Sequence, residues 1–130
     1  MTDAVAQFAK AKYFNLETFR KNGMGVRTPV WFAESGDGST SERVTFYLYS
    51  EANAGKVKRV RNNPKVRIAP CNFRGDLRGA WVEGRARLCA NDEVARGQEL
   101  LRRKYWLKIV GDFFGRLMRH KNAVIAIELD

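Results

Sequence analysis

The chain has 130 residues, of which 45% are hydrophobic and 29% are charged, and this composition predicts one globular domain spanning 1–130 rather than a disordered chain. No apolar run reaches the roughly 18 residues needed to span a membrane, and the N-terminus lacks the pattern of a secretory signal, so we expect a cytoplasmic protein. The net charge of +10 comes from residues 56–121, which hold eighteen Lys and Arg against six Asp and Glu, and this excess favours an anionic partner.

Alternation and turn signals predict three strands in the first half of the chain, after a short helix over residues 4–11. Asn22-Gly23 is a strong hairpin signal between the first two strands. Pro29 cannot donate to a ladder, so we expect an edge, a bulge or a break at that point, with backbone groups left free to bind a ligand. Ser35–Glu42 is predicted to be an exposed loop. The predicted strands are Tyr13–Arg20, Met24–Ala33 and Val44–Tyr49.

A short basic helix is predicted over Asn53–Asn62. Val57 and Val60 would form its inner face, and Pro64 ends the helical region because the residue before a proline avoids helical geometry. Cations occupy four of the other eight positions. They suit a phosphorylated ligand, although a solvated helix face is the alternative interpretation. These cations are Lys56, Lys58, Arg59 and Arg61.

The second half of the chain is predicted to add three strands and a helical region. Asn91 is a candidate cap for a helix that continues to about Tyr105, and a second helical stretch follows over residues 109–118. The predicted strands are Lys65–Phe73, Gly79–Cys89 and Ala123–Leu129, with a turn at Arg74-Gly75-Asp76. Six strands with short helices between them predict a mainly β fold, a small closed or split antiparallel barrel.

The sequence contains few candidates for catalysis by side chains. It has no GxSxG nucleophile elbow, no HExxH and no Gly-rich phosphate loop. One histidine, His120, and no Cys/His cluster argue against a metal site, and Cys71 and Cys89 are expected to be free thiols. Glu83, between arginines, is interpreted as part of a surface ion pair. If the protein is an enzyme, we therefore expect a cofactor to carry the chemistry.

Three segments in order, FNLETFRKNGMGVRTPVWFA, YLYSEANAGKVKRVRNNPKVRIAPC and RGAWVEGRARL, resemble the pyridoxamine-phosphate-oxidase-like split β-barrel superfamily. More narrowly, they resemble its small group of oxidoreductases that depend on the deazaflavin coenzyme F-420. The resemblance runs from about Lys12 to Leu129. It implies a homodimer of six-stranded split barrels, with two flavin or deazaflavin sites at the dimer interface.

The resemblance also implies that nine residues bind the cofactor. Four match the strand that lines the ring system and phosphate, two match the strand end on the phosphate side, and three match the basic helix. In that order they are Arg27, Thr28, Pro29 and Val30; Tyr49 and Ser50; and Lys56, Lys58 and Arg59. Lys56 matches the lysine that pairs with the phosphate, Lys58 and Arg59 would help to hold an acidic tail, and Trp81 matches the strand that reaches toward the partner's site.

Gly55 departs from this pattern, because FMN-binding relatives tend to carry an arginine immediately before the helix lysine. The phosphate clamp for FMN is then weaker, unless Arg27 or Arg59 compensates. This favours the deazaflavin, whose oligoglutamate tail would also meet the cationic surface.

The resulting hypothesis is an oxidoreductase that transfers hydride from a reduced deazaflavin, or alternatively from FMN, to a small conjugated organic acceptor. One alternative is a flavin, deazaflavin or haem carrier without turnover, for which His120 would be the candidate haem ligand. A more distant alternative is a nucleic-acid-binding protein, suggested by the basic second half and by aromatic residues such as Phe73 and Tyr105. No nucleic-acid motif is present, and we expect neither a nucleic acid nor a membrane as partner.

Overall fold

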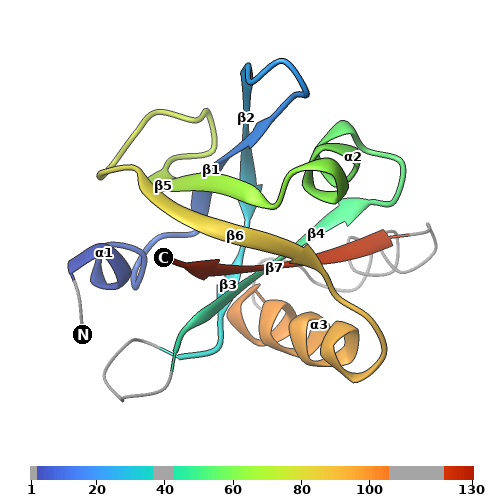
Figure 1. The fold of residues 1–130 in the computed structure, drawn as a ribbon. Helices are drawn as coiled ribbons and strands as arrows, with labels where there is room; N and C mark the ends of the chain where they lie inside the picture. Colours follow the sequence, from blue (N-terminus) through green and yellow to red (C-terminus); the bar gives the residue numbers. More distant parts are fainter. Residues whose placement is uncertain (1–2, 37–42, 106–121) are drawn as a thin grey trace.

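A single antiparallel sheet organises the protein (Figure 1). The computed structural model describes residues 3–36, 43–105 and 122–130, and within them the strands lie in the order β2-β1-β5-β6-β7-β4-β3. The strands are β1 (Tyr13–Phe19), β2 (Gly25–Trp31), β3 (Ala33–Glu34), β4 (Thr45–Glu51), β5 (Lys65–Cys71), β6 (Val82–Leu88) and β7 (Asn122–Leu129). The helices are α1 (Asp3–Ala6), α2 (Gly55–Asn62) and α3 (Asp92–Tyr105).

The two ends of the sheet are formed by one continuous segment, residues 25–34. Its first part, β2, pairs with β1, and its last part, β3, pairs with β4, so the sheet curls back on itself into a split barrel. This confirms the predicted fold class. The hairpin at Asn22-Gly23 is also confirmed, because Arg20 N–H bonds to the carbonyl of Met24 and Gly23 has a φ of 88°.

The expected strand Met24–Ala33 is divided at Phe32, so the sheet has seven strands rather than six. The physical reason is the phenol of Tyr105. Its oxygen accepts a hydrogen bond from Phe32 N–H at 3.2 Å and lies 2.6 Å from the carbonyl oxygens of Phe32 and Lys12. A hydroxyl from α3 therefore takes the place of a strand partner at Phe32.

The barrel interior is filled by aromatic and aliphatic side chains. Phe8 contacts three other buried phenylalanines, and among these Phe14 and Phe32 stack with their ring centroids 4.5 Å apart. Val57 and Val60 of α2 join this core, as their predicted place on the inner helix face requires. Helix α2 therefore closes one end of the barrel.

Helix α3 packs on the outer side of β4 and β7. Gly97 permits this close approach, because a Cβ there would lie 2.9 Å from Cγ1 of Val124 and 3.0 Å from the ring of Tyr47. The predicted helix Asn91–Tyr105 is thus confirmed, with its first residue at Asp92. The second helical stretch expected over residues 109–118, and His120, lie outside the described residues.

The sequence predicts neither a membrane-spanning segment nor a metal site, and the described residues can be examined for both. None of the helices described is long and apolar enough to cross a membrane, and no group of three or more His, Cys, Asp and Glu among the described residues could hold a metal ion. Cys71 and Cys89 are free, and burial raises the pKa of the Cys71 thiol to about 11 and of the Cys89 thiol to about 12.

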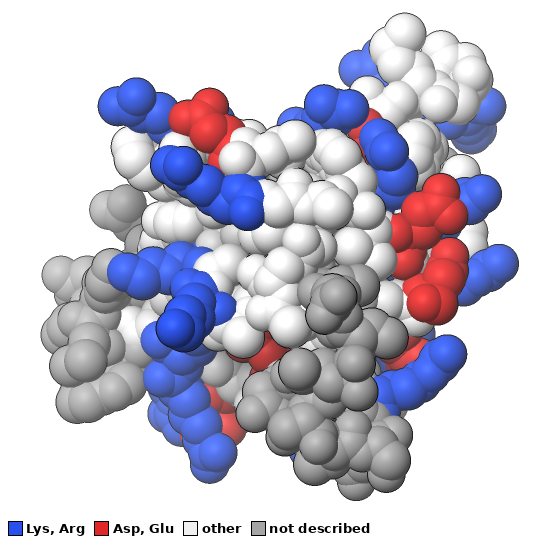
Figure 2. Space-filling model, turned by 90° about the vertical axis from the view of Figure 1, so that its left-hand side faces the viewer, with Lys and Arg blue, Asp and Glu red and all other residues white. Residues whose placement is uncertain are grey.

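Charged side chains are unevenly spread over the surface. Figure 2 shows the side that carries α1 and the connection between β5 and β6, where lysines and arginines lie around an uncharged central area. Acidic side chains gather mainly at one edge of this view.

Candidate functional site

The basic helix α2 is placed by its two valines and by the turn that precedes it. Val57 and Val60 are buried in the barrel core, so the cationic positions must point elsewhere. Ala54 N–H bonds to the carbonyl of Glu51 at 3.0 Å, which joins the end of β4 directly to the start of the helix. Asn63 N–H closes the last turn on the carbonyl of Arg59.

Arg59 folds back over the start of its own helix. Its Nε donates a hydrogen bond of 2.6 Å to Oγ1 of Thr18, a fully buried residue of β1. Its Nη1 lies where a larger residue at position 55 would begin, because a Cβ on Gly55 would be only 2.7 Å from it. Gly55 therefore leaves room for the guanidinium of Arg59.

Lys56 and Arg20 complete a group of three cations with Arg59, which we name the α2 cation cluster. Burial, together with the charge of Arg59, lowers the pKa of Lys56, while Glu51 opposes this effect. The pKa of Arg59 is lowered in the same way, by burial and by Arg20. Within the described ranges, no carboxylate forms an ion pair with any member of the cluster.

Two hydroxyl groups lie beside this cluster in the fold. Thr18 contacts Arg59, and Ser50, 5% exposed, lies on β4 next to the turn that leads into α2, with its Oγ donating to the carbonyl of Glu51 at 3.2 Å. Guanidinium, ammonium and hydroxyl groups in one place form the donor set that recognises phosphate.

Arg27 lies on the other face of the sheet. Its Nε is 2.9 Å from Oε2 of Glu17, and Arg67 binds the other oxygen of Glu17 at 2.6 Å. Both guanidinium groups also lie over the ring of Trp81, at 4.8 and 4.9 Å. Burial raises the pKa of Glu17, but the two arginines outweigh it and the net pKa is lowered. We name these four residues the Glu17 cluster.

The separation of the two clusters follows from strand geometry. Glu17 and Thr18 are consecutive in β1, and consecutive side chains in a strand point to opposite faces. Arg27, bound to Glu17, is therefore across the sheet from Arg59, bound to Thr18. Of the two arginines expected to compensate for Gly55, the geometry favours Arg59.

The remaining predicted residues of β2 differ in exposure. Pro29 is exposed on a strand whose hydrogen-bonded neighbour is β1 alone, so the expectation of an edge is confirmed. Thr28 is half-buried, and Val30 belongs to the barrel core. Among these three residues, Pro29 is the most open to a ligand and Val30 the least.

Tyr49 and Lys58 do not belong to the α2 cation cluster. Tyr49 packs among residues of α3 such as Leu100, and burial raises its pKa to about 12, with a hydrogen bond from Gln98 acting in the opposite direction. Lys58 is exposed on α2. The nine predicted residues therefore divide into three groups: α2 with the adjoining Ser50, the strand β2, and Tyr49 at the packing surface of α3.

Thr18 and Arg20 are site residues that the sequence did not indicate. Alternation along β1 places Thr18 on the core face, but only the packing of α2 brings Arg59 to it across 41 positions. No local spacing in the sequence signals such a contact.

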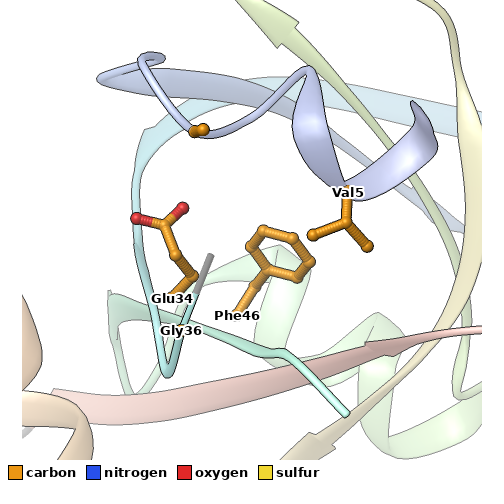
Figure 3. Close-up of a pocket in the computed structure, with 5 residues that line it drawn as sticks. Val5, Glu34, Gly36 and Phe46 are labelled. Carbon is orange, nitrogen blue, oxygen red and sulfur yellow. The ribbon is translucent and has the colours of Figure 1, made fainter. Parts of the chain in front are cut away.

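A small pocket elsewhere contains none of the nine residues. It has a volume of about 190 Å³ and is lined by Val5, Ala9, Glu34, Gly36 and Phe46. Figure 3 shows the carboxylate of Glu34 pointing into it. Burial raises the pKa of Glu34, although Lys104, whose Nζ lies 3.3 Å from Oε1, partly offsets this.

Comparison with solved structures identifies proteins of the same fold at low identity. A Bacteroides thetaiotaomicron protein provisionally described as a 5-nitroimidazole antibiotic resistance protein is 15% identical, with a TM-score of 0.71 over 100% of this chain and 80% of its own. The heme storage protein HutZ from Vibrio cholerae is 12% identical, with a TM-score of 0.69 over 98% and 87%. A Listeria innocua protein provisionally described as a pyridoxamine 5'-phosphate oxidase is 16% identical, with a TM-score of 0.66 over 98% and 91%.

These structural matches establish the fold alone, and no curated protein sequence matches the chain. The family model described as pyridoxamine 5'-phosphate oxidase, however, matches residues 1–130. The sequence resemblance to the split β-barrel superfamily is therefore confirmed, and the protein belongs to the pyridoxamine 5'-phosphate oxidase family.

Proposed function

We propose that this protein is an oxidoreductase that holds a phosphorylated flavin-type cofactor, coenzyme F-420 or FMN, at the α2 cation cluster. The observation that carries this proposal is the position of Arg59 over Gly55, beside Lys56 and without a described carboxylate partner. Glu51 offsets part of the repulsion among these three cations without forming an ion pair with any of them, and a bound phosphate would relieve the rest.

The residues present fit both the phosphate and the ring system of such a cofactor. Arg59 and Lys56 supply charge for the phosphate, and the edge of β2 around Pro29 offers backbone groups to a ring system. A bound flavin or deazaflavin would supply hydride-transfer chemistry. The protein would position the conjugated acceptor and exclude water, and the acceptor would take up the hydride together with a proton from solvent.

The geometry of α2 is compatible with either cofactor. Arg59 brings a guanidinium to the position above Gly55, which supports FMN despite the missing arginine at residue 55. Lys58 is exposed on the same helix and could meet the acidic tail of F-420. The absorbance spectrum of protein purified from a host that makes both cofactors would distinguish them.

The phosphate assignment is tested by titrating Lys56→Ala with each cofactor. We expect the Kd to rise about tenfold or more, the effect of losing one charge-assisted contact. The matched control is Arg61→Ala, which removes an exposed cation from the far end of the same helix and should bind like wild type. If Lys56→Ala also binds like wild type, the site is wrongly assigned.

We also expect a homodimer, because the family resemblance implies that the cofactor lies between two copies. Light scattering after size-exclusion chromatography would check this, and a monomer that binds cofactor at full affinity would contradict it.

A second candidate is a cofactor carrier without turnover, including a haem carrier. It is favoured by the presence of a heme storage protein among proteins of the same fold. A carrier would bind cofactor stoichiometrically and reduce no acceptor. Titration with haem provides the test, and the haem version fails if the Soret band does not shift.

A further inference from the structure

A separate hollow lies between the segment that leads into β1 and the connection between β5 and β6. Its volume is about 440 Å³, within the range of small-molecule sites. We name it the Phe73 pocket. Its apolar lining includes Tyr13, Pro70, Cys71 and Phe73, and its cationic lining includes Lys10 and Arg78. We propose that the Phe73 pocket binds a small organic anion with a flat apolar body, such as an aromatic carboxylate.

Hydrogen bonds hold the walls of the pocket in place without a ligand. The side-chain amide of Gln7 donates to the carbonyl of Ala80 and accepts from its N–H, both at 2.9 Å, which ties the two walls together. Arg78 N–H donates to the carbonyl of Pro70 at 2.7 Å. Pre-formed walls reduce the entropy that a ligand must lose on binding.

A second set of bonds shapes the turn beside Phe73. The Oδ1 atom of Asn72 accepts from the N–H groups of Arg74 and Asp76, at 2.9 and 3.0 Å. Gly75 has a φ of 90°, a conformation that glycine adopts without strain. The turn therefore keeps a fixed shape next to the pocket.

The charge of the pocket favours an anion. Its lining contains no carboxylate, and Lys10 and Arg78 form no ion pair within the part of the chain that the structure describes. Asp76 lies beside this lining, where it accepts a hydrogen bond from Nδ2 of Asn72; burial and the charge of Asp76 raise the pKa of Cys71. The side of the molecule in Figure 2 likewise shows cations around an uncharged area.

The apolar lining selects for a hydrophobic body on that anion. Phe73 is 64% exposed, and a large exposed phenyl group gains free energy when a ligand covers it. Cys71 is 5% exposed, and its raised pKa keeps the thiol neutral, so it acts as an apolar contact.

None of the lining residues of the Phe73 pocket belongs to the α2 cation cluster or to β2. The pocket can therefore be tested on the whole protein by calorimetric titration with 2-naphthoate. The neutral analogue 2-naphthalenemethanol has the same ring system without the charge. We expect 2-naphthoate to bind at least about tenfold more tightly than the alcohol.

Substitutions of the lining residues test whether 2-naphthoate binds in the Phe73 pocket. Phe73→Ala should weaken 2-naphthoate about tenfold through lost apolar contact. Lys10→Gln combined with Arg78→Gln should reduce the preference for the anion, with Lys12 left as a cation in the lining. Arg85→Gln, which removes an exposed cation from β6, is the control and should leave binding unchanged. Phe73, Lys10 and Arg78 line the pocket and are exposed, so their substitution should not prevent folding.

Two results would overturn the proposal. One is 2-naphthoate that binds Lys10→Gln/Arg78→Gln as tightly as wild type. The other is a dimer of wild-type protein that does not bind 2-naphthoate and that Phe73→Ala converts to a monomer, because this would identify the pocket as a contact between copies.

Discussion

Arginines on the two faces of β1 have different kinds of partner. On the outer face, Arg27 and Arg67 share the carboxylate of Glu17 and lie over Trp81. On the inner face, Arg59 bonds to the neutral hydroxyl of Thr18 and has Lys56 and Arg20 as charged neighbours. Arginines that pair with a carboxylate support the fold, whereas cations without an ion-pair partner retain the capacity to bind an anion.

Removing the carboxylate of the outer face should have the largest effect. Glu17→Gln leaves two arginines without their shared partner, and we expect a loss of about 2–3 kcal/mol in the free energy of unfolding. Urea denaturation would measure it. Glu83→Gln, an exposed position on β6, is the control and should change stability by less than about 0.5 kcal/mol. Equal effects for the two variants would contradict a structural role for Glu17.

The difference in stability between wild type and Glu17→Gln should also depend on pH, and the pKa of Glu17 sets the direction of that dependence. The pKa of Glu17 is lowered in the folded state from its ordinary value of 4.5. Its contribution is therefore complete above that ordinary value and is lost as the pH falls through the folded pKa. The stability difference between wild type and Glu17→Gln should shrink in acid, and a difference that grows as the pH falls would argue against the ion pairs.

Substituting one arginine on each face of β1 should separate effects on cofactor binding from effects on stability. Arg59→Ala is expected to weaken cofactor binding about 30-fold, ~2 kcal/mol, by removing a charged hydrogen-bond donor from the phosphate site. Arg27→Ala should leave phosphate affinity close to wild type and cost about 1 kcal/mol of stability, because Arg67 still pairs with Glu17. Cofactor titration and denaturation of both variants would check this, and the reverse pattern would place the phosphate on the outer face.

The smallest effect concerns the placement of Arg59. Gly55→Ala adds a Cβ that would meet Nη1 of Arg59 at 2.7 Å, so the guanidinium must move. We expect cofactor affinity to fall about fivefold while stability changes by less than about 1 kcal/mol. Gly36→Ala is the matched control, because nothing lies within 4 Å of the added carbon. Unchanged affinity in Gly55→Ala would show that the position of Arg59 does not matter for binding.

Much of the fold was predictable because its signals are local. Alternation located the strands, Asn22-Gly23 located the hairpin, and the spacing of Val57 and Val60 identified the inner face of α2. The break at Phe32 was not predictable, because it depends on a hydroxyl that Tyr105 supplies from 73 residues away.

The candidate site was predictable in its components and not in its arrangement. The cations of α2 and the unusual Gly55 are visible in the sequence, and so is the choice between Arg27 and Arg59 as compensating residues. Tyr49 shows the limit, since its place on β4 beside Ser50 gave no sign that its side chain packs against α3.

By itself, then, the sequence determined the strands, the helix faces and a run of cations with a glycine before it. Only the tertiary structure decided which arginines pair with a carboxylate and which do not. That outcome depends on the register that sets Glu17 between Arg27 and Arg67, and on the packing of α2 over Thr18. Both contacts join residues distant in the chain, where no local pattern reports which charges will meet.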